Sequence, residues 1–127
     1  ASLDDAHYAL AETHLEALAD RVVATLSHGQ RRQLEVAMCI ATRPQLLLLD
    51  EPLAGMGGEE SATMLELLES LREGHAIMLV EHDMDAVFRI ADRITVMVNG
   101  SVIASDTPGA VRANAAVQTA YLGEADA

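Results

Sequence analysis

The sequence contains no lysine, because all eight of its basic residues are arginines. A phosphate-binding P-loop of the G-x-x-x-x-G-K-[ST] type requires a lysine whose ammonium group reaches the β- and γ-phosphates. A phosphate site built on such a loop is therefore not contained in these 127 residues.

Positive charge and aromatic side chains are both scarce. Twenty acidic residues outweigh the eight arginines, giving a formal net charge of −12, and only 2% of the residues are aromatic. Nonspecific binding to nucleic acid or to an anionic membrane depends on a cationic surface. The composition argues against both of these functions.

Cysteine and long apolar runs are also nearly absent. The single cysteine, Cys39, cannot form a disulfide within the chain, which is typical of a reducing compartment. It falls inside an apolar helical pattern, which predicts a buried thiol. No run approaches the roughly 18 apolar residues of a membrane-spanning helix, and we see no signal peptide. Half of the residues are hydrophobic, so a domain with a real core is expected.

The most informative stretch is Leu46–Pro52, in which four leucines lead into Asp50, Glu51 and a proline. A short apolar run that ends at a turn signal predicts a buried parallel strand. Ligands of open α/β sheets bind at the carboxyl ends of the strands. Two carboxylates at such an end are costly to bury without a cation or hydrogen bonds, so we expect chemistry at Asp50 and Glu51. The alternative is a core strand with two solvated acids at its tip.

A second apolar run, Ala76–Val80, ends in Glu81-His82-Asp83. A helical pattern over about 59–72 separates the two runs, and strand, helix and strand at this spacing predict a right-handed parallel unit. His82 should then lie at the same sheet edge as Glu51. A lone histidine is more often structural, but this position favours a functional role.

The run Ser27-His28-Gly29-Gln30 precedes another helical pattern. Ser27 and Gln30 have the spacing of a capping box, with serine at the N-cap and glutamine at N3. The simple interpretation is a well-capped helix. The functional interpretation is that the amides and positive dipole end of the helix bind an anion, with Gly29 allowing close approach of a phosphate.

The two ends of the sequence give further expectations. Residues 1–25 have apolar residues near helical spacing, which predicts a helix. Asn99-Gly100 between two apolar runs predicts a β-hairpin. Thr107-Pro108 has the pattern of an N-cap followed by N1, and a last helical segment is expected over about 115–122.

The order of these pieces resembles the ATP-binding-cassette (ABC) transporter ATPases. The run Leu26–Gln30 is similar to the family signature, with histidine where glycine is commonest, and Leu46–Glu51 is similar to Walker B with its following glutamate. Leu53–Gly57 corresponds to the D-loop, although Gly57 replaces the usual acid or amide, and His82 corresponds to the switch histidine. Four runs resemble the branched-chain amino-acid transporter branch of the family: Glu51–Met56, Val80–Met84, Thr107-Pro108 and Tyr121–Gly123.

The resemblance implies roles for these residues. Asp50 would hold Mg²⁺, directly or through water. Glu51 would polarise the attacking water as general base, and His82 would contact the γ-phosphate of ATP. The remaining site residues would contact the nucleotide bound to the opposite subunit of a head-to-tail dimer: Ser27, Gly29 and Gln30.

The resemblance also implies an architecture, an α/β fold that is part of a P-loop NTPase. A mostly parallel sheet would be flanked by helices, with a C-terminal hairpin and helices. Residues 1–45 would form part of the helical subdomain, and residues 46–127 the C-terminal half of the ATPase core. The Walker A half is missing, so we expect the isolated chain to be inactive and to self-associate through its uncovered sheet.

The function implied is that of an ABC transporter ATPase that couples ATP hydrolysis to import of branched-chain amino acids. Its partners would be a second ATP-binding subunit and transmembrane permease subunits, at the cytoplasmic face of the inner membrane. Alternatives are a urea or amide importer, a non-enzymatic remnant or assembly partner, and a cassette protein that acts on DNA or ribosomes. An unrelated α/β domain with coincidental acids is the remaining alternative.

Overall fold

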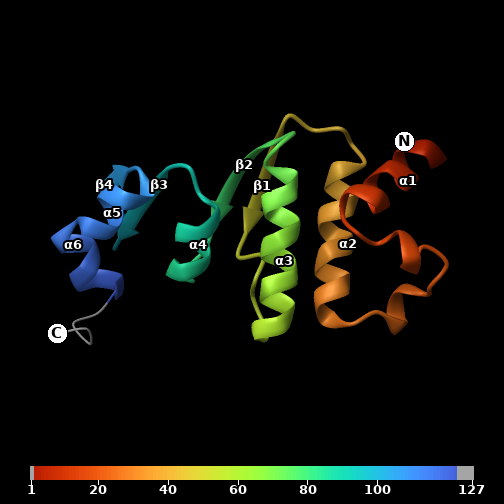
Figure 1. Cartoon of the computed structure of the whole chain (residues 1–127), viewed down its shortest axis with the longest axis horizontal. Helices are drawn as coiled ribbons and strands as arrows, with labels where there is room; N and C mark the ends of the chain where they lie inside the picture. Colours follow the sequence, from red (N-terminus) through yellow and green to blue (C-terminus); the bar gives the residue numbers. More distant parts are fainter. Residues whose placement is uncertain (1, 123–127) are drawn as a thin grey trace. The chain divides into compact units, whose positions relative to one another are not determined.

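The computed structural model describes residues 2–122 and divides into two compact units, Ala1–Glu81 and His82–Ala127. Figure 1 shows the elements of each unit along the chain. Gly123, the last residue of one run that carries the resemblance, lies outside the described residues. No helix in the described part is long and apolar enough to cross a membrane.

The first unit begins with α1 (Leu3–Glu12), which is followed by the short 3₁₀ helices η1 (Glu16–Leu18) and η2 (Val23–Thr25). The single helix predicted over residues 1–25 is therefore wrong. The Thr13 hydroxyl donates to the carbonyl of Ala9 at 2.8 Å, and His14 has φ +60°. A side chain that bonds to the backbone and a left-handed residue together end the helix, which apolar spacing alone does not reveal.

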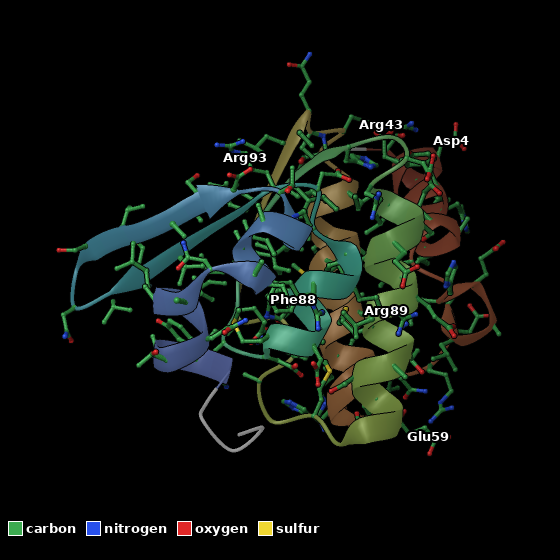
Figure 2. All side chains as sticks on the ribbon, turned by 60° about the vertical axis from the view of Figure 1, so that its left-hand side comes forward. Asp4, Arg43, Glu59, Phe88, Arg89 and Arg93 are labelled. Atoms are coloured by element: carbon green, nitrogen blue, oxygen red, sulfur yellow. The ribbon has the colours of Figure 1, made fainter. Side chains whose placement is uncertain are left out.

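Polar contacts fix the start of α1. The Ser2 amide donates to the Asp5 carboxylate at 3.1 Å, and Arg43 approaches that carboxylate at 3.2 Å. The Ser2 amide and the Arg43 guanidinium lower the pKa of Asp5 below its ordinary value. The guanidinium of Arg43 also lies 3.6 Å from the centroid of the Tyr8 ring, beside α1 (Figure 2). These contacts hold α1 against the segment that follows α2.

The helix α2 (His28–Ile40) begins as the sequence predicts. Ser27 is its N-cap and accepts from the Gln30 amide at 3.1 Å, while the Gln30 side chain accepts from the Ser27 amide at 2.9 Å. Its buried face consists of Gly29, Gln33, Val36, Ala37 and Ile40. Cys39 is exposed, so the prediction of a buried thiol is wrong. Met38 beside it is also exposed, and the buried direction is taken by Val36, Ala37 and Ile40 instead.

The parallel unit is confirmed. The strands β1 (Leu46–Asp50) and β2 (Ala76–Val80) pair in parallel, with Leu46 opposite Ala76 and Asp50 opposite Val80. The helix α3 (Gly58–Leu71) connects them and buries five apolar side chains: Met64, Leu65, Leu67, Leu68 and Leu71. The strands end level with each other, which brings the residues that follow them to one sheet edge.

One face of this sheet is uncovered. Leu47 is only 2% exposed, but Leu48 and Met78 are 68% and 60% exposed and lie opposite each other in the register. Leu46 and Val80 are also exposed. The fully buried strand predicted from the leucine run is therefore wrong, because within residues 2–122 the parallel sheet has two strands. The expected open face is confirmed.

The first turns of α2 and α3 are joined by a hydrogen bond. The two helices lie side by side in Figure 1, and Figure 2 shows Glu59 in the first turn of α3. The next residue, Glu60, accepts from the Gly29 amide at 2.5 Å. A Cβ atom at position 29 would clash with Oε2 of Glu60. Only glycine allows the carboxylate this close to the backbone of α2.

The second unit contains the hairpin and the C-terminal helices. After α4 (Met84–Ile90), the strands β3 (Ile94–Val98) and β4 (Ser101–Asp106) pair antiparallel, and Asn99 and Gly100 both have positive φ as a type I′ turn requires. Thr107 caps the helix that begins at Pro108, as predicted. The remaining elements are α5 (Pro108–Ala113), α6 (Ala115–Val117) and the π-helix η3 (Gln118–Leu122).

Four buried side chains form the core of the second unit: Ile94, Val96, Val111 and Val117. Around this core, the Arg112 guanidinium lies 4.2 Å from the centroid of the Phe88 ring, and the Tyr121 hydroxyl donates to the carbonyl of Met97. The C-terminal helices are thus tied to both α4 and the hairpin.

The contact between Gly29 and Glu60 gives a stability prediction. In the native protein, Gly29→Ala should lower the free energy of unfolding by about 1 kcal/mol, because the methyl group displaces a charge-assisted hydrogen bond. With Glu60→Ala already present, the same substitution should be neutral or stabilise by up to about 1 kcal/mol, because alanine favours the helix. Urea denaturation of the four proteins of this double-mutant cycle measures the coupling.

The control is Gly58→Ala, whose added Cβ would meet nothing within 4 Å. It should not show the cost that Gly29→Ala shows. Equal costs of Gly29→Ala in the two backgrounds would mean that Glu60 does not determine the requirement for glycine.

Candidate functional site

The two carboxylates predicted from the leucine run lie at the end of β1. Asp50 is the last residue of the strand and is exposed. Glu51 follows it with φ +48°, a left-handed conformation that costs a non-glycine residue about 1–3 kcal/mol. Its amide donates to the carbonyl of Val80 at 2.7 Å. The chain thus turns sharply while it is still bonded to β2.

The carbonyl of Glu51 is held by two donors. The Ala54 amide donates to it at 3.0 Å, and Nη2 of Arg32 donates to it at 2.7 Å. The other terminal nitrogen of Arg32 lies 3.4 Å from a carboxylate oxygen of Glu35. A residue of α2 therefore supports the backbone of the turn at Glu51–Ala54, which we call the acidic turn.

Glu81 supports the same turn from β2. Its carboxylate accepts from the Leu53 amide at 3.3 Å. The sequence patterns did not predict a site role for Glu81, Arg32 or Glu60. For Glu81 a signal was available, because it directly follows β2 and so lies at the same edge as Glu51. For the other two residues the contacts depend on how α2 packs, which no local pattern specifies.

The residues predicted to bind an anion lie at the N-terminus of α2. Ser27 and Gln30 are engaged with each other in the capping box, and the Gly29 amide donates to Glu60. A helix N-terminus favours negative charge, and in this structure a carboxylate of the same chain meets that preference. The structure thus brings these three residues together at one helix end.

His28, which stands where the resembled signature most often has glycine, also makes a defined contact. Nε2 of His28 lies 3.0 Å from the carbonyl of Ala54. Because a carbonyl only accepts, Nε2 must carry the proton in this contact. The N-terminal part of α2 therefore contacts three positions: Ala54 through His28, Glu60 through Gly29 and Glu51 through Arg32.

His82 begins the second unit, directly after Glu81 in the chain, and is exposed. Asp83 next to it is the N-cap of α4 and accepts from the Ala86 amide at 3.2 Å. That His82 acts at the same edge as Glu51 stays a prediction.

Asp50 lines a shallow cavity of about 190 Å³ together with Arg32, Glu35 and Pro52. A single exposed carboxylate suits Mg²⁺, which binds proteins through one or two carboxylates and keeps several waters. Glu51 is also exposed. The arrangement has the donor types that a metal-assisted hydrolysis requires.

Comparison with protein families gives two matches. Residues 1–54 match the family model of the ABC transporters, and residues 101–127 match that of the branched-chain amino acid ATP-binding cassette transporters. The resemblance carried by the motifs is therefore confirmed by matches at both ends of the chain.

Individual relatives agree with the family models. The chain is 44% identical over 122 residues to the high-affinity branched-chain amino acid transport ATP-binding protein BraF of Pseudomonas aeruginosa, covering 94% of this chain and 48% of BraF. It is 45% identical over 109 residues to LivG of Escherichia coli, a protein of the same description, covering 84% of this chain and 43% of LivG. The chain thus spans about half the length of the curated relatives it matches.

Solved structures show the same fold. An ATP-binding cassette of an ABC transporter, MJ1267, in its ADP conformation matches with a TM-score of 0.81 and 29% identity, covering 95% of this chain and 50% of that one. The cassette protein CbiO1 of Clostridium perfringens matches with a TM-score of 0.79 and 32% identity, over 87% and 45% of the two chains. The fold class predicted from the sequence, a partial ABC ATPase fold, is therefore confirmed. The chain belongs to the ATP-binding subunits of the ABC transporter family, and its matches include proteins of the branched-chain amino acid branch.

Proposed function

We propose that this chain is the C-terminal part of an ABC transporter ATPase that couples ATP hydrolysis to import of branched-chain amino acids. The observation that carries the proposal is the acidic turn at the end of β1, in a chain 44% identical to BraF. A leucine-rich strand that ends in an exposed aspartate and a strained glutamate is poorly explained by packing alone.

The residues of the site would have distinct roles. The exposed carboxylate of Asp50 would bind Mg²⁺, which when bound neutralises charge on the phosphates. Glu51 would accept a proton from the attacking water, and its left-handed backbone would fix the direction of its side chain. His82 would donate a hydrogen bond to the γ-phosphate, where negative charge develops.

The N-terminus of α2 would serve a second subunit. Ser27, Gly29 and Gln30 would contact the nucleotide held mainly by the opposite chain of a head-to-tail dimer. The Gly29 amide already donates to a carboxylate at 2.5 Å, which supports its role as a hydrogen-bond donor to an anion. For phosphate to take this place, Glu60 would have to leave it.

The organisation proposed for the whole protein follows from the same reasoning. Residues 1–45 would belong to the helical subdomain and residues 46–127 to the ATPase core. The partners would be a second ATP-binding subunit and membrane permease subunits, with the ATPase peripheral at the cytoplasmic face of the inner membrane. A P-loop would come from outside these residues, because the chain has no lysine.

Two other functions remain as alternatives. A urea or amide importer would use the same catalytic residues, and transport assays with different solutes separate it from an amino-acid importer. A non-enzymatic remnant or assembly partner is favoured by one observation, the absence of lysine. The first prediction below separates that alternative from an ATPase.

Glu51→Gln should reduce ATP turnover about 10²- to 10⁴-fold in the native transporter that contains this chain, because glutamine cannot act as a general base. Nucleotide binding should be retained, since the substitution keeps the shape of the side chain. Steady-state hydrolysis and equilibrium nucleotide binding are the two measurements. The matched control is Glu66→Gln, an exposed glutamate of α3, which should leave turnover unchanged. Turnover that survives Glu51→Gln, or a native protein that never hydrolyses ATP, would contradict the proposed mechanism.

The isolated 127-residue chain should self-associate and should not hydrolyse ATP. The exposed apolar face of β1 and β2 is expected to pair with another copy, because such a face is unfavourable in water. Sedimentation velocity over a range of concentrations measures the association. Introducing charge at the centre of the face, with Leu48→Glu and Met78→Glu together, should shift the chain toward monomer.

The control for this experiment is Leu3→Glu, which changes an exposed leucine of α1 outside the sheet. It should leave the association unchanged. A wild-type chain that stays monomeric at all concentrations would show that the open sheet face is tolerated in water.

A further inference from the structure

We propose that Arg32 is a positioning residue for Glu51, through which α2 sets the geometry of the acidic turn. The proposal rests on the proposed function, because it assigns Glu51 a role in hydrolysis. It concerns a residue outside the expected site, one that the resemblance leaves without a role.

The geometry of Arg32 carries the proposal. Its Nη2 donates to the Glu51 carbonyl at 2.7 Å, and its side chain is only 26% exposed. The same guanidinium lies 3.4 Å from Glu35, one turn further along α2. Glu35 is 65% exposed and holds the guanidinium from the solvent side. The contact with Glu35 therefore orients Arg32, and the contact with the Glu51 carbonyl connects α2 to the turn.

The bonded group explains why this contact matters. Glu51 has φ +48°, a conformation that persists only where its surroundings enforce it. Its carbonyl belongs to the peptide that follows the strained residue, so holding the carbonyl fixes that peptide and limits rotation at Glu51. The second donor, Ala54, lies within the same turn. Of the two donors to this carbonyl, only Arg32 connects it to another element.

An arginine is suited to this role for a chemical reason. A charged donor makes a shorter and stronger hydrogen bond than a neutral one, and the planar guanidinium binds Glu35 and the carbonyl at the same time. Lysine could supply the charge but not both directions in a fixed plane.

The contact also links the N-terminal part of α2 to the turn at Glu51. Ser27 and Gln30 begin the helix that carries Arg32. Under the proposed function these residues contact the nucleotide of the opposite site in a dimer, while Glu51 acts in the site of its own chain. A shift of α2 on nucleotide binding would then move the carbonyl of Glu51 through Arg32. The link runs through one side chain, so it can be tested by substitution.

The first test measures kinetics in the native transporter. Arg32→Gln should lower kcat about 10- to 100-fold, because a small misplacement of a catalytic group has effects of this size. The KM and the affinity for ATP should stay unchanged, since Arg32 is not proposed to touch nucleotide. Arg32→Lys should recover part of kcat, and Glu35→Gln, which removes only the ion pair, should leave most of it. In a Glu51→Gln background, Arg32→Gln should have no further effect.

The second test does not depend on activity. Hydrogen exchange of the Ala54 amide, which donates to the same carbonyl, should become about tenfold faster in Arg32→Gln, the effect expected from losing one hydrogen bond. The Glu35→Gln protein should exchange at nearly the wild-type rate. Exchange can be measured even if the wild-type protein hydrolyses no ATP, so failure of the proposed function is distinguishable from failure of this contact.

Three results would overturn the proposal. One is an unchanged exchange rate at Ala54 in Arg32→Gln. Another is a loss of ATP affinity with kcat unchanged, which would make Arg32 a binding residue. The last is a kcat in Arg32→Lys as low as in Arg32→Gln together with an equal loss of folding stability, which would indicate a purely structural role. If Arg32→Gln fails to fold, the kcat and Ala54 exchange of Arg32→Lys decide the question.

Discussion

The left-handed turn at Glu51 is the constraint on which the rest of the site depends. It costs about 1–3 kcal/mol, and it is held by hydrogen bonds from three directions. The carbonyl of Val80 accepts from the Glu51 amide, Arg32 donates to the Glu51 carbonyl, and Glu81 accepts from Leu53. Because these partners come from β2, α2 and the residue after β2, the geometry of the turn reports how those elements are assembled. A strained residue supported in this way is expected where chemistry requires one fixed side-chain direction.

The N-terminus of α2 shows a related balance between stability and function. Its dipole and amides attract an anion, and the Glu60 carboxylate of the same chain provides one at 2.5 Å from the Gly29 amide. This contact stabilises the helix end and the packing of α2 on α3. Under the proposed function it also competes with phosphate, since one amide proton cannot serve both groups fully. The glycine that admits the carboxylate is the same residue that would admit a nucleotide.

Much of the fold could be predicted because its determinants are local in sequence. The capping box at Ser27, the type I′ turn at Asn99-Gly100 and the helix start at Thr107 each depend on residues within three positions of one another. Where local interactions compete, prediction failed: Thr13 and His14 end α1, although the apolar spacing continues. Arg32 and Glu60 could not be found either, because their partners lie 19 and 31 positions away. Their roles arise only when α2 packs beside the turn and α3.

The open face of the sheet and the acidic turn belong to one physical problem. The leucines of β1 suit a strand covered on both faces, yet Leu48 remains 68% exposed and only Leu47 is buried well. The same strand carries Asp50 and Glu51 at its end, so whatever covers the open face also limits how far that end can move. The support that Arg32 gives from α2 acts on one side of the turn only. Whatever covers the open face would therefore add to the support from α2 in holding the carboxylates as firmly as catalysis requires.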